Sequence, residues 1–152
     1  SQANAEENTL LVDAYCGGGL FGLSAASSFK KVVGIEISRE GFEGARTNAQ
    51  INRIENAQFF LGDAGTIFQE IPDRTEPTAL IIDPPRRGCD PDFIRQAIEF
   101  FPQRIVYVSC EPSTQARDAQ ILINAGYEAI SSQPFDLFPQ TRHVENVLTL
   151  NR

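Results

Sequence analysis

The chain has 152 residues, 41% of them hydrophobic and 22% charged, which is enough for one domain with a core of its own. A net charge of −7 argues against a domain that binds nucleic acid by itself through a basic surface. No membrane segment or signal peptide is visible, and three scattered cysteines with one histidine argue against a disulfide framework or a metal site, so an intracellular protein is expected.

Short apolar runs alternate with helical patterns along the chain. Strands are expected at 9–15, 32–37, 57–63, 79–85 and 104–110, and two more, 127–138 and 143–151, follow without a helix between them. Helices are expected at 20–29, 39–52, 65–71, 91–101 and 113–126, with Ser38 as an N-cap and Pro91 in a first turn. The order predicts an α/β fold with a mostly parallel seven-stranded sheet, helices on both faces and a C-terminal antiparallel hairpin. This outline is similar to that of the Rossmann-like class I methyltransferases.

The loop DAYCGGGLFG follows the first strand, at the end of the sheet where such folds bind ligands. Gly17, Gly19 and Gly22 match G-x-G-x-x-G, which lets the backbone approach a nucleoside ligand closely. Glu36 ends the second strand, where a carboxylate accepts hydrogen bonds from ribose hydroxyls. The pattern fits NAD and S-adenosylmethionine equally, and a glycine-rich turn without a ligand stays open. Asp63 is either an acceptor for adenine or a helix N-cap.

The segment IIDPPRRG ends the fourth strand. Its two prolines stiffen the turn, so that Asp83 can point into the ligand cleft. Methyltransferases often carry D/N-P-P at this place, and those that methylate amino groups continue with an aromatic residue. Arg86 occupies that position here, which argues against an exocyclic amine as the target. Arg86 and Arg87 are candidates for contacting phosphate, and a rigid loop with two solvated arginines is the alternative.

Cys110 ends the fifth strand just before a helix, where helix N–H groups and the nearby Arg117 favour a thiolate. A thiolate that adds to carbon 6 of a pyrimidine makes carbon 5 nucleophilic, and a base must afterwards remove the proton from carbon 5. Glu145, at the start of the last strand, is a candidate for that base. From spacing alone, Cys110 also fits a small core thiol and Glu145 an exposed edge carboxylate. His143 is interpreted as a structural hydrogen-bonding residue.

Five segments together resemble the RNA uracil-5-methyltransferase family over residues 10–150: DAYCGGGLFGL, VVGIEIS, IIDPPRRG, YVSCEPSTQARD and FPQTRHVE. They are most similar to the tRNA (uracil-5-)-methyltransferases that make the thymine of the T loop. The resemblance implies methyl transfer from S-adenosyl-L-methionine to carbon 5 of a tRNA uridine, through a covalent bond from Cys110 to carbon 6. It implies Glu145 as the general base and Tyr15, Glu36 and Asp83 as cofactor contacts.

Two departures from the family pattern stand out. Glu111 replaces the usual asparagine beside the cysteine, and a carboxylate disfavours a neighbouring thiolate. The RNA-binding region and the F-x-Q-x-N segment that precede the catalytic domain in the family are absent from 1–152. We therefore expect one S-adenosylmethionine-dependent catalytic domain taken from a longer protein, which would reconcile the acidic charge with tRNA as the partner. Arg86, Arg87 and Arg117 are the candidate RNA contacts within it.

Other functions remain open at this point. A cytosine-5 methyltransferase usually carries a second cysteine within the fourth-strand motif, whereas Cys89 follows its glycine. Ribosomal RNA is an alternative substrate, and a tRNA-binding or folding module with vestigial catalysis would not require Cys110. An NAD-dependent oxidoreductase leaves the DPPR segment and the pair of Cys110 and Glu145 unexplained. The wording VDAYCGGGLF is similar to eukaryotic, in particular fungal, sequences, and a cytoplasmic, nuclear or mitochondrial location is open.

Overall fold

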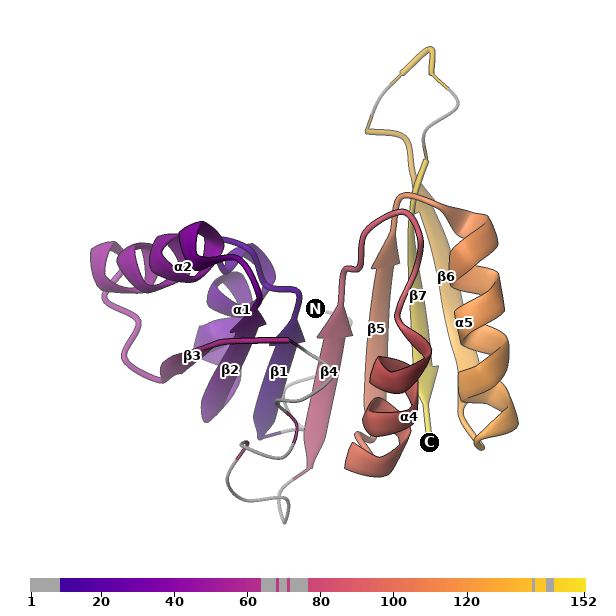
Figure 1. Cartoon of the computed structure of the whole chain (residues 1–152), viewed down its shortest axis with the longest axis horizontal. Helices are drawn as coiled ribbons and strands as arrows, with labels where there is room; N and C mark the ends of the chain where they lie inside the picture. Colours follow the sequence, from indigo (N-terminus) through magenta and orange to yellow (C-terminus); the bar gives the residue numbers. More distant parts are fainter. Residues whose placement is uncertain (1–8, 64–67, 69–70, 72–76, 138, 142–143) are drawn as a thin grey trace.

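The computed structural model describes residues 9–63, 68, 71, 77–137, 139–141 and 144–152, which form one seven-stranded sheet with helices on both faces (Figure 1). The elements are β1 (Leu10–Ala14), α1 (Leu20–Ala25), η1 (Ala26–Ser28), β2 (Lys31–Glu36), α2 (Arg39–Ile51), β3 (Ala57–Leu61), β4 (Thr78–Ile82), α4 (Pro91–Phe100), β5 (Arg104–Ser109), α5 (Pro112–Asn124), β6 (Glu128–Phe135) and β7 (Glu145–Asn151). The helix expected at 65–71, apart from Phe68 and Ile71, lies outside the described residues, as does His143.

The strand order in the sheet is β3-β2-β1-β4-β5-β7-β6. β1 to β5 pair in parallel, whereas β7 lies antiparallel between β5 and β6. The predicted parallel sheet with a C-terminal antiparallel hairpin is therefore confirmed. The chain order reverses between β1 and β4, so ligands of this fold bind beyond the carboxyl ends of these strands, at the upper edge in Figure 1.

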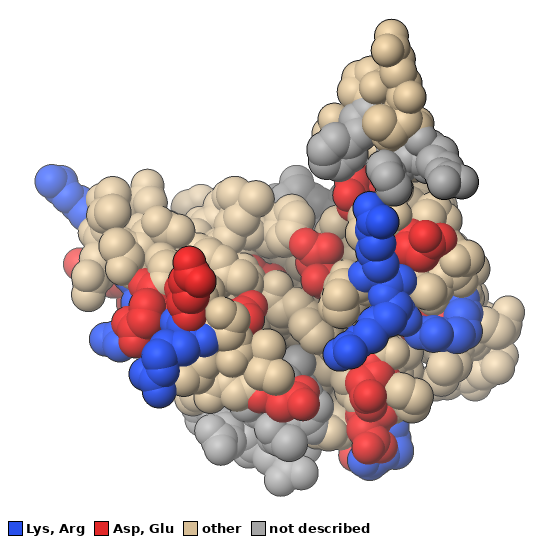
Figure 2. Space-filling view, turned by 45° about the horizontal axis from the view of Figure 1, so that its top comes forward, with Lys and Arg blue, Asp and Glu red and all other residues tan. Residues whose placement is uncertain are grey.

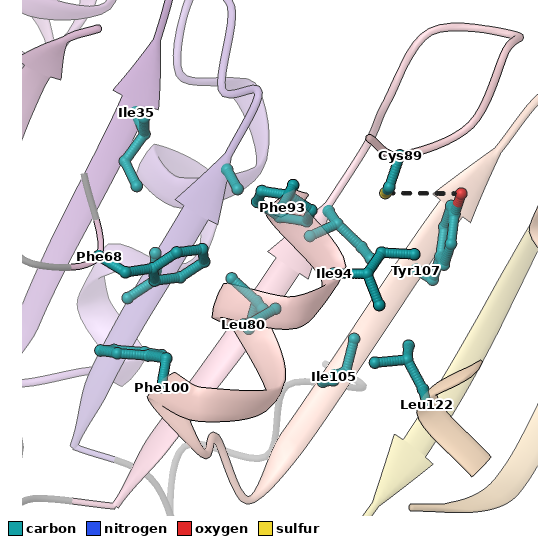
Figure 3. Close-up of a cluster of buried hydrophobic side chains, with 14 of the residues drawn as sticks. Ile35, Phe68, Leu80, Cys89, Phe93, Ile94, Phe100, Ile105, Tyr107 and Leu122 are labelled. Atoms are coloured by element: carbon teal, nitrogen blue, oxygen red, sulfur yellow. Dashed lines mark hydrogen bonds between the residues drawn. The ribbon is translucent and has the colours of Figure 1, made fainter. Parts of the chain in front are cut away.

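Side chains of the central strands alternate between two hydrophobic cores. One core lies under α4 and α5 and includes Phe93, Phe100 and Leu122 with Leu80 and Tyr107 of the sheet (Figure 3). The other core lies on the opposite face under α1 and η1 and joins strand residues to residues of these two helices and the segment after them: Leu11, Val32, Ile81, Val106, Ala26 and Phe29. Because each buried large apolar side chain contributes about 1.5–3 kcal/mol, the two cores fix which strand residues face which helices.

The helix ends show where the sequence was sufficient and where it was not. The Ser38 side chain accepts a hydrogen bond from the Gly41 N–H at 3.3 Å, which confirms it as the N-cap of α2. The helix expected at 20–29 instead ends at Ala25 and continues as the 3₁₀ turn η1. The side-chain amide of Asn56 donates to the carbonyls of Ala26 and Phe29, both at 2.9 Å, and so satisfies the end of this segment from outside it.

Several strands stop earlier than expected, among them β3, β4 and β5, which end at Leu61, Ile82 and Ser109. After β4, the prolines at 84 and 85 have no N–H to donate to a ladder. Each of the three strands is followed within one or two residues by a candidate site residue: Asp63, Asp83 and Cys110. The candidate residues thus lie just beyond the regular sheet, on its carboxyl edge.

Two glycines give opposite predictions for stability. A Cβ at Gly34 on β2 would lie 2.5 Å from the Phe59 ring, whereas a Cβ at Gly44 on α2 would have 3.9 Å to its nearest neighbour. We expect Gly34→Ala to lower the free energy of unfolding by about 1–3 kcal/mol through overpacking. We expect Gly44→Ala to raise it by about 0.5–1 kcal/mol, because alanine favours the helix. Urea denaturation of both variants measures the difference, and equal effects would contradict the packing of β2 against β3.

Candidate active site

Candidate site residues from five elements share one face of the sheet. Asp13 and Glu36 follow the alternation of Leu11 and Val32, which belong to the core under α1. The same alternation, continued past the strand ends, places Asp83, Cys110 and Glu145 on this face. The charge of Asp13 interacts with those of Glu36 and Asp83, and Asp83 interacts with Glu145. The carboxyl edge of the sheet is therefore strongly acidic on this face.

Asp13 is the most deeply buried of these carboxyls, with 1% of its surface exposed. Its Oδ2 accepts a hydrogen bond of 2.7 Å from the Gly22 N–H of α1, and its Oδ1 is buried without a partner within the described part of the chain. Burial raises the pKa of Asp13 to about 7, the Gly22 N–H counteracts the shift, and the charges of Asp83 and Glu36 add to it. Sequence reasoning assigned Asp13 no role of its own, because an aspartate at a strand end has many uses.

The glycine loop is held on the carboxylate of Glu36. One oxygen of Glu36 accepts the Gly17 N–H at 2.8 Å and the other accepts the Ser38 N–H at 2.7 Å. Gly17 has a φ of +52°, which disfavours other residues, and the space where a Cβ would stand is open. Gly19 is the N-cap of α1. Because a carboxylate offers about four acceptor positions, Glu36 keeps room for ligand hydroxyls.

Tyr15 has a φ of +63°, a left-handed conformation that is rare outside glycine and concentrated at functional sites. Its ring packs against Phe93 with 5.1 Å between ring centroids. Burial raises the pKa of Tyr15, and the charge of Asp63 is among the smaller contributions, so the two residues lie close together. Asp63 itself is exposed, and the residues that would decide whether it caps a helix lie outside the described part.

Asp83 and Glu145 approach each other from β4 and β7. Burial raises the pKa of Asp83 to about 6, and the negative charge of Glu145 raises it further. Both carboxyls are half-buried rather than fully solvated. Spacing along the chain could not reveal this pair, since 62 positions separate the two residues (145 − 83).

Cys110 and Glu145 lie at neighbouring ends of β5 and β7. The register ends with the pair of Ser109 and Asn146, and Cys110 and Glu145 are the next residues beyond that pair. Among the three free thiols, Cys110 is partly exposed, whereas Cys16 and Cys89 are buried. Burial raises the pKa of both buried thiols, so they stay protonated at neutral pH. The accessible thiol and the candidate base thus meet at the same edge.

Gln115 holds the two strands that carry this pair. It is 3% exposed, and its Nε2 donates to the carbonyls of Tyr107 at 2.8 Å and of Asn146 at 3.2 Å. Asn146 Nδ2 in turn donates to Gln115 Oε1 at 2.6 Å. Asn146 directly follows Glu145, so the exchange of hydrogen bonds fixes the strand on which the candidate base stands. Sequence reasoning missed both residues, although both lie within the conspicuous segments STQARD and HVENV.

Hydrogen bonds next to Cys110 hold both the backbone and the side chain of Glu111. The Ser109 side chain accepts the Glu111 N–H at 3.0 Å and donates to the Glu111 carbonyl at 3.1 Å, which closes a tight turn around Cys110. The Glu111 carboxylate accepts a hydrogen bond of 2.7 Å from the Ser113 hydroxyl of α5. The carboxylate is therefore engaged by the first turn of the following helix.

The three candidate arginines differ in their contacts. Arg86 and Arg87 are exposed on the loop after β4. The guanidinium of Arg117 binds Asp118 at 2.7 Å and the Arg87 carbonyl at 3.1 Å, contacts that the sequence did not indicate. The predicted influence of Arg117 on the Cys110 thiol stays a prediction.

The described residues contain neither a cluster suited to a metal ion nor a helix suited to a membrane. Within the described ranges, no group of three or more histidine, cysteine or acidic side chains is arranged to hold a metal ion. None of the helices in that part of the chain has the length and apolar character needed to cross a bilayer. The described residues at this edge offer a thiol, carboxylates, backbone N–H groups and arginines.

Comparisons with known proteins find relatives that are named as RNA methyltransferases. A family model described as tRNA (Uracil-5-)-methyltransferase matches residues 1–152. The chain is 46% identical over 145 residues to the tRNA (uracil(54)-C(5))-methyltransferase of Schizosaccharomyces pombe, and 45% identical over 149 residues to an uncharacterised RNA methyltransferase of Oceanobacillus iheyensis. These matches cover 93% and 97% of the chain but 28% and 32% of the relatives. Since the relatives come from a fungus and a bacterium, a fungal source stays a prediction.

A solved structure supports the same placement. The tRNA (uracil-54, C5)-methyltransferase of Pyrococcus abyssi, in complex with S-adenosyl-L-homocysteine, superposes with a TM-score of 0.81 at 33% sequence identity. The match covers 96% of this chain and 36% of that one. The chain thus spans about a third of the length of the relatives it matches.

The coupling between Asp83 and Glu145 gives a testable prediction. We expect Glu145→Gln to lower the pKa of Asp83, because it removes a neighbouring negative charge that favours the protonated form. Titration of the Asp83 carboxyl carbon by NMR measures the change. Glu128→Gln, at the opposite end of the β6–β7 hairpin, is the matched control and should leave the titration of Asp83 in place. Identical Asp83 titrations in wild type and Glu145→Gln would contradict the pairing.

Proposed function

The chain belongs to the tRNA (uracil-5-)-methyltransferase family, and we propose that residues 1–152 are the catalytic domain of an enzyme that methylates carbon 5 of a uridine in tRNA. The observation that best supports the proposal is the register of β5 and β7, which ends next to Cys110 and Glu145, with the charge of Glu145 acting on Asp83. The names of the relatives, which specify uracil 54, support a T-loop uridine as the target. They favour tRNA over ribosomal RNA.

The residues present fit S-adenosyl-L-methionine as the cofactor. Open space beside Gly17, remaining acceptor positions on Glu36 and the unpartnered Oδ1 of Asp13 suit a ligand with ribose hydroxyls and positive charge. The residues that would hold it are those that line this edge: Tyr15, Gly17, Gly19, Glu36, Asp63 and Asp83. When bound, S-adenosylmethionine supplies an electrophilic methyl group.

Cys110 acts as the nucleophile in this proposal. Its sulfur forms a bond to carbon 6 of the uracil, and the electron pair of the 5,6 double bond moves toward the carbonyl at position 4, which makes carbon 5 nucleophilic. The turn closed by Ser109 holds the thiol at the strand end, and the free N–H groups at the start of α5 lie just after it. The target base has to leave its stack to reach the thiol.

Glu145 acts as the general base. After carbon 5 has gained the methyl group, the carboxylate of Glu145 removes the remaining proton from carbon 5, the double bond re-forms and the bond from sulfur to carbon 6 breaks. The bonds from Gln115 to Asn146 and to the Tyr107 carbonyl hold the base at a fixed distance from the nucleophile.

Contacts to the RNA are proposed for Arg86, Arg87 and Arg117, near the loop after β4. Their guanidinium groups suit phosphate, and the remaining two thirds of a protein of the relatives' length would supply the main grip on tRNA. Cys89 does not fit the second cysteine of a cytosine-5 enzyme, because it is buried and bonded to the Tyr107 hydroxyl at 3.7 Å (Figure 3).

The mechanism predicts two covalent complexes. With RNA that carries 5-fluorouridine, the full-length protein should form a stable adduct, because fluorine cannot leave as a proton. With ordinary RNA, Glu145→Gln should accumulate a methylated adduct, since the final proton transfer is blocked. Denaturing gels and mass spectrometry detect both complexes.

Cys110→Ala is the control for both experiments and should abolish each adduct, also when combined with Glu145→Gln. Adducts that persist without Cys110 would show that the nucleophile has been misassigned. A folding module without catalysis would leave the cellular 5-methyluridine content unchanged on deletion, whereas we expect that content to fall at one tRNA position.

A further inference from the structure

A groove of about 450 Å³ lies between α4 and α5, and none of the proposed catalytic or cofactor residues lines it. Its walls carry the side chains of Arg87 and Arg117, the acidic Asp90 and Asp118, and the apolar Ile94 and Ile121. The charge of Arg87 also lowers the pKa of Tyr15, so one wall of the groove lies close to the proposed cofactor site. Figure 2 shows Lys and Arg side chains gathered on one part of the molecular surface, beside carboxylates.

Asp118 lies beneath the groove and organises it. The residue is 1% exposed, and both of its carboxylate oxygens are engaged. Its Oδ2 accepts the Cys89 N–H at 2.8 Å and the Tyr107 hydroxyl at 2.7 Å, and its Oδ1 accepts two N–H groups of Arg117, from Nε at 2.8 Å and from Nη2 at 2.7 Å. A carboxylate buried at such desolvation cost and so fully bonded fixes one arrangement of the loop and helix around it.

Two successive backbone carbonyls of the loop after β4 accept hydrogen bonds from side chains of α5. Thr114 Oγ1 donates to the Arg86 carbonyl at 3.1 Å, and Arg117 Nη2 donates to the Arg87 carbonyl at 3.1 Å. Gly88 has a φ of +80°, and a Cβ there would lie 2.5 Å from Arg117 Nη2 and 2.6 Å from Asp118 Oδ2. The close approach of loop and helix therefore requires glycine, and it holds the two arginines side by side.

Both arginines keep donors for a ligand. Arg117 uses its Nε and Nη2 within the protein, so the two N–H groups of Nη1 have no hydrogen-bond partner in the described part of the chain. The Arg117 side chain is 55% exposed. The exposed Arg87 guanidinium likewise has no hydrogen bond or ion pair within that part. Asp118 makes all four of its hydrogen bonds within the protein, and two of them orient the Arg117 guanidinium, which lines the groove.

We propose that the groove between α4 and α5 binds one backbone phosphate of the RNA substrate through Arg87 and Arg117, with Asp118 as the positioning residue that orients Arg117. The proposal rests on the proposed function, because it takes as ligand the RNA whose target base reaches Cys110. The loop after β4 is bonded to Thr114 of α5, four residues after Cys110. Arginine suits this role, since its planar fork matches phosphate. The bonds from Asp118 leave little motion to lose on binding.

Asp90 allows a direct test, because its negative charge repels a phosphate in the groove. It lines the groove, is exposed, and caps α4 by accepting the Asp92 N–H at 2.9 Å. Asparagine caps helices equally well, so Asp90→Asn removes a negative charge from the groove without removing the cap. Asp92→Asn is the matched control, because Asp92 carries the same charge on the same helix turn but does not line the groove and faces Arg95 at 3.5 Å.

The experiment measures binding of a T-arm RNA hairpin by fluorescence anisotropy between 0.05 and 0.3 M KCl, with full-length protein in a Cys110→Ala background. We expect Arg87→Gln to weaken binding roughly three- to tenfold and to lower the slope of log K against log salt by roughly 0.7–0.9. We expect Asp90→Asn to tighten binding roughly two- to fivefold, with Asp92→Asn close to the parent protein. The dissociation constant for S-adenosylmethionine should be the same in all variants.

The role of Asp118 has its own readout. Asp118→Asn should lower RNA affinity and salt slope as Arg87→Gln does, and adding Arg87→Gln to it should weaken binding less than it does in the parent protein. Fully additive effects would overturn the positioning role, and unchanged binding in both Arg87→Gln and Asp90→Asn would overturn the phosphate site. Because those two variants are on the surface, they decide the question even where Asp118→Asn fails to fold. Absence of any 5-methyluridine product from the wild-type protein would instead overturn the proposed function.

Discussion

Side chains along a β-strand point alternately to the two faces of its sheet. In this chain the candidate site residues lie on one face, and the residues of the larger core lie on the other. Asp13, Glu36, Asp83, Cys110 and Glu145 all follow the alternation of the core under α1. The intervening strand residues face α4 and α5, where they form the larger core. A shift of one residue in the pairing of β5 with β7 would exchange the two sets, so the register of these strands is the constraint on which the site depends.

The supporting face contains polar residues as well as apolar ones, and they act where the strands leave the sheet. Gln115 and Asp118 stand one turn apart on α5 and are 3% and 1% exposed. Gln115 binds β5 and β7, and Asp118 binds β5 and the loop after β4. A buried polar group that lacks a partner is costly, so each satisfied bond excludes alternative positions of these segments. One helix thereby sets the relative positions of Cys110, Glu145 and the arginine loop.

The sequence predicted features that depend on near neighbours or on strand ends. The order of strands and helices, the Ser38 cap and the location of Cys110 at a strand end all follow from local pattern. It could not predict bonds between distant segments, such as Asp118 to Cys89, or Asn56 to the end of η1. The helix expected at 20–29 was too long for the same reason. The residue that satisfies the end of this segment, Asn56, comes 27 positions after Phe29. Spacing was equally silent on Asp83 and Glu145, which the sheet topology brings together.

The position of β7 between β5 and β6 has a consequence for how the molecule is made. A ribosome produces β5, α5 and β6 before β7, and among the described strands β6 pairs with β7 alone. Until β7 emerges, β5 keeps an open edge and β6 lacks a partner among these strands, so both expose unpaired backbone groups to other chains. The nascent protein thus carries Cys110, the proposed nucleophile, before it has the strand that bears Glu145, the proposed base. Completion of this sheet and assembly of the proposed catalytic pair therefore occur in the same step of synthesis.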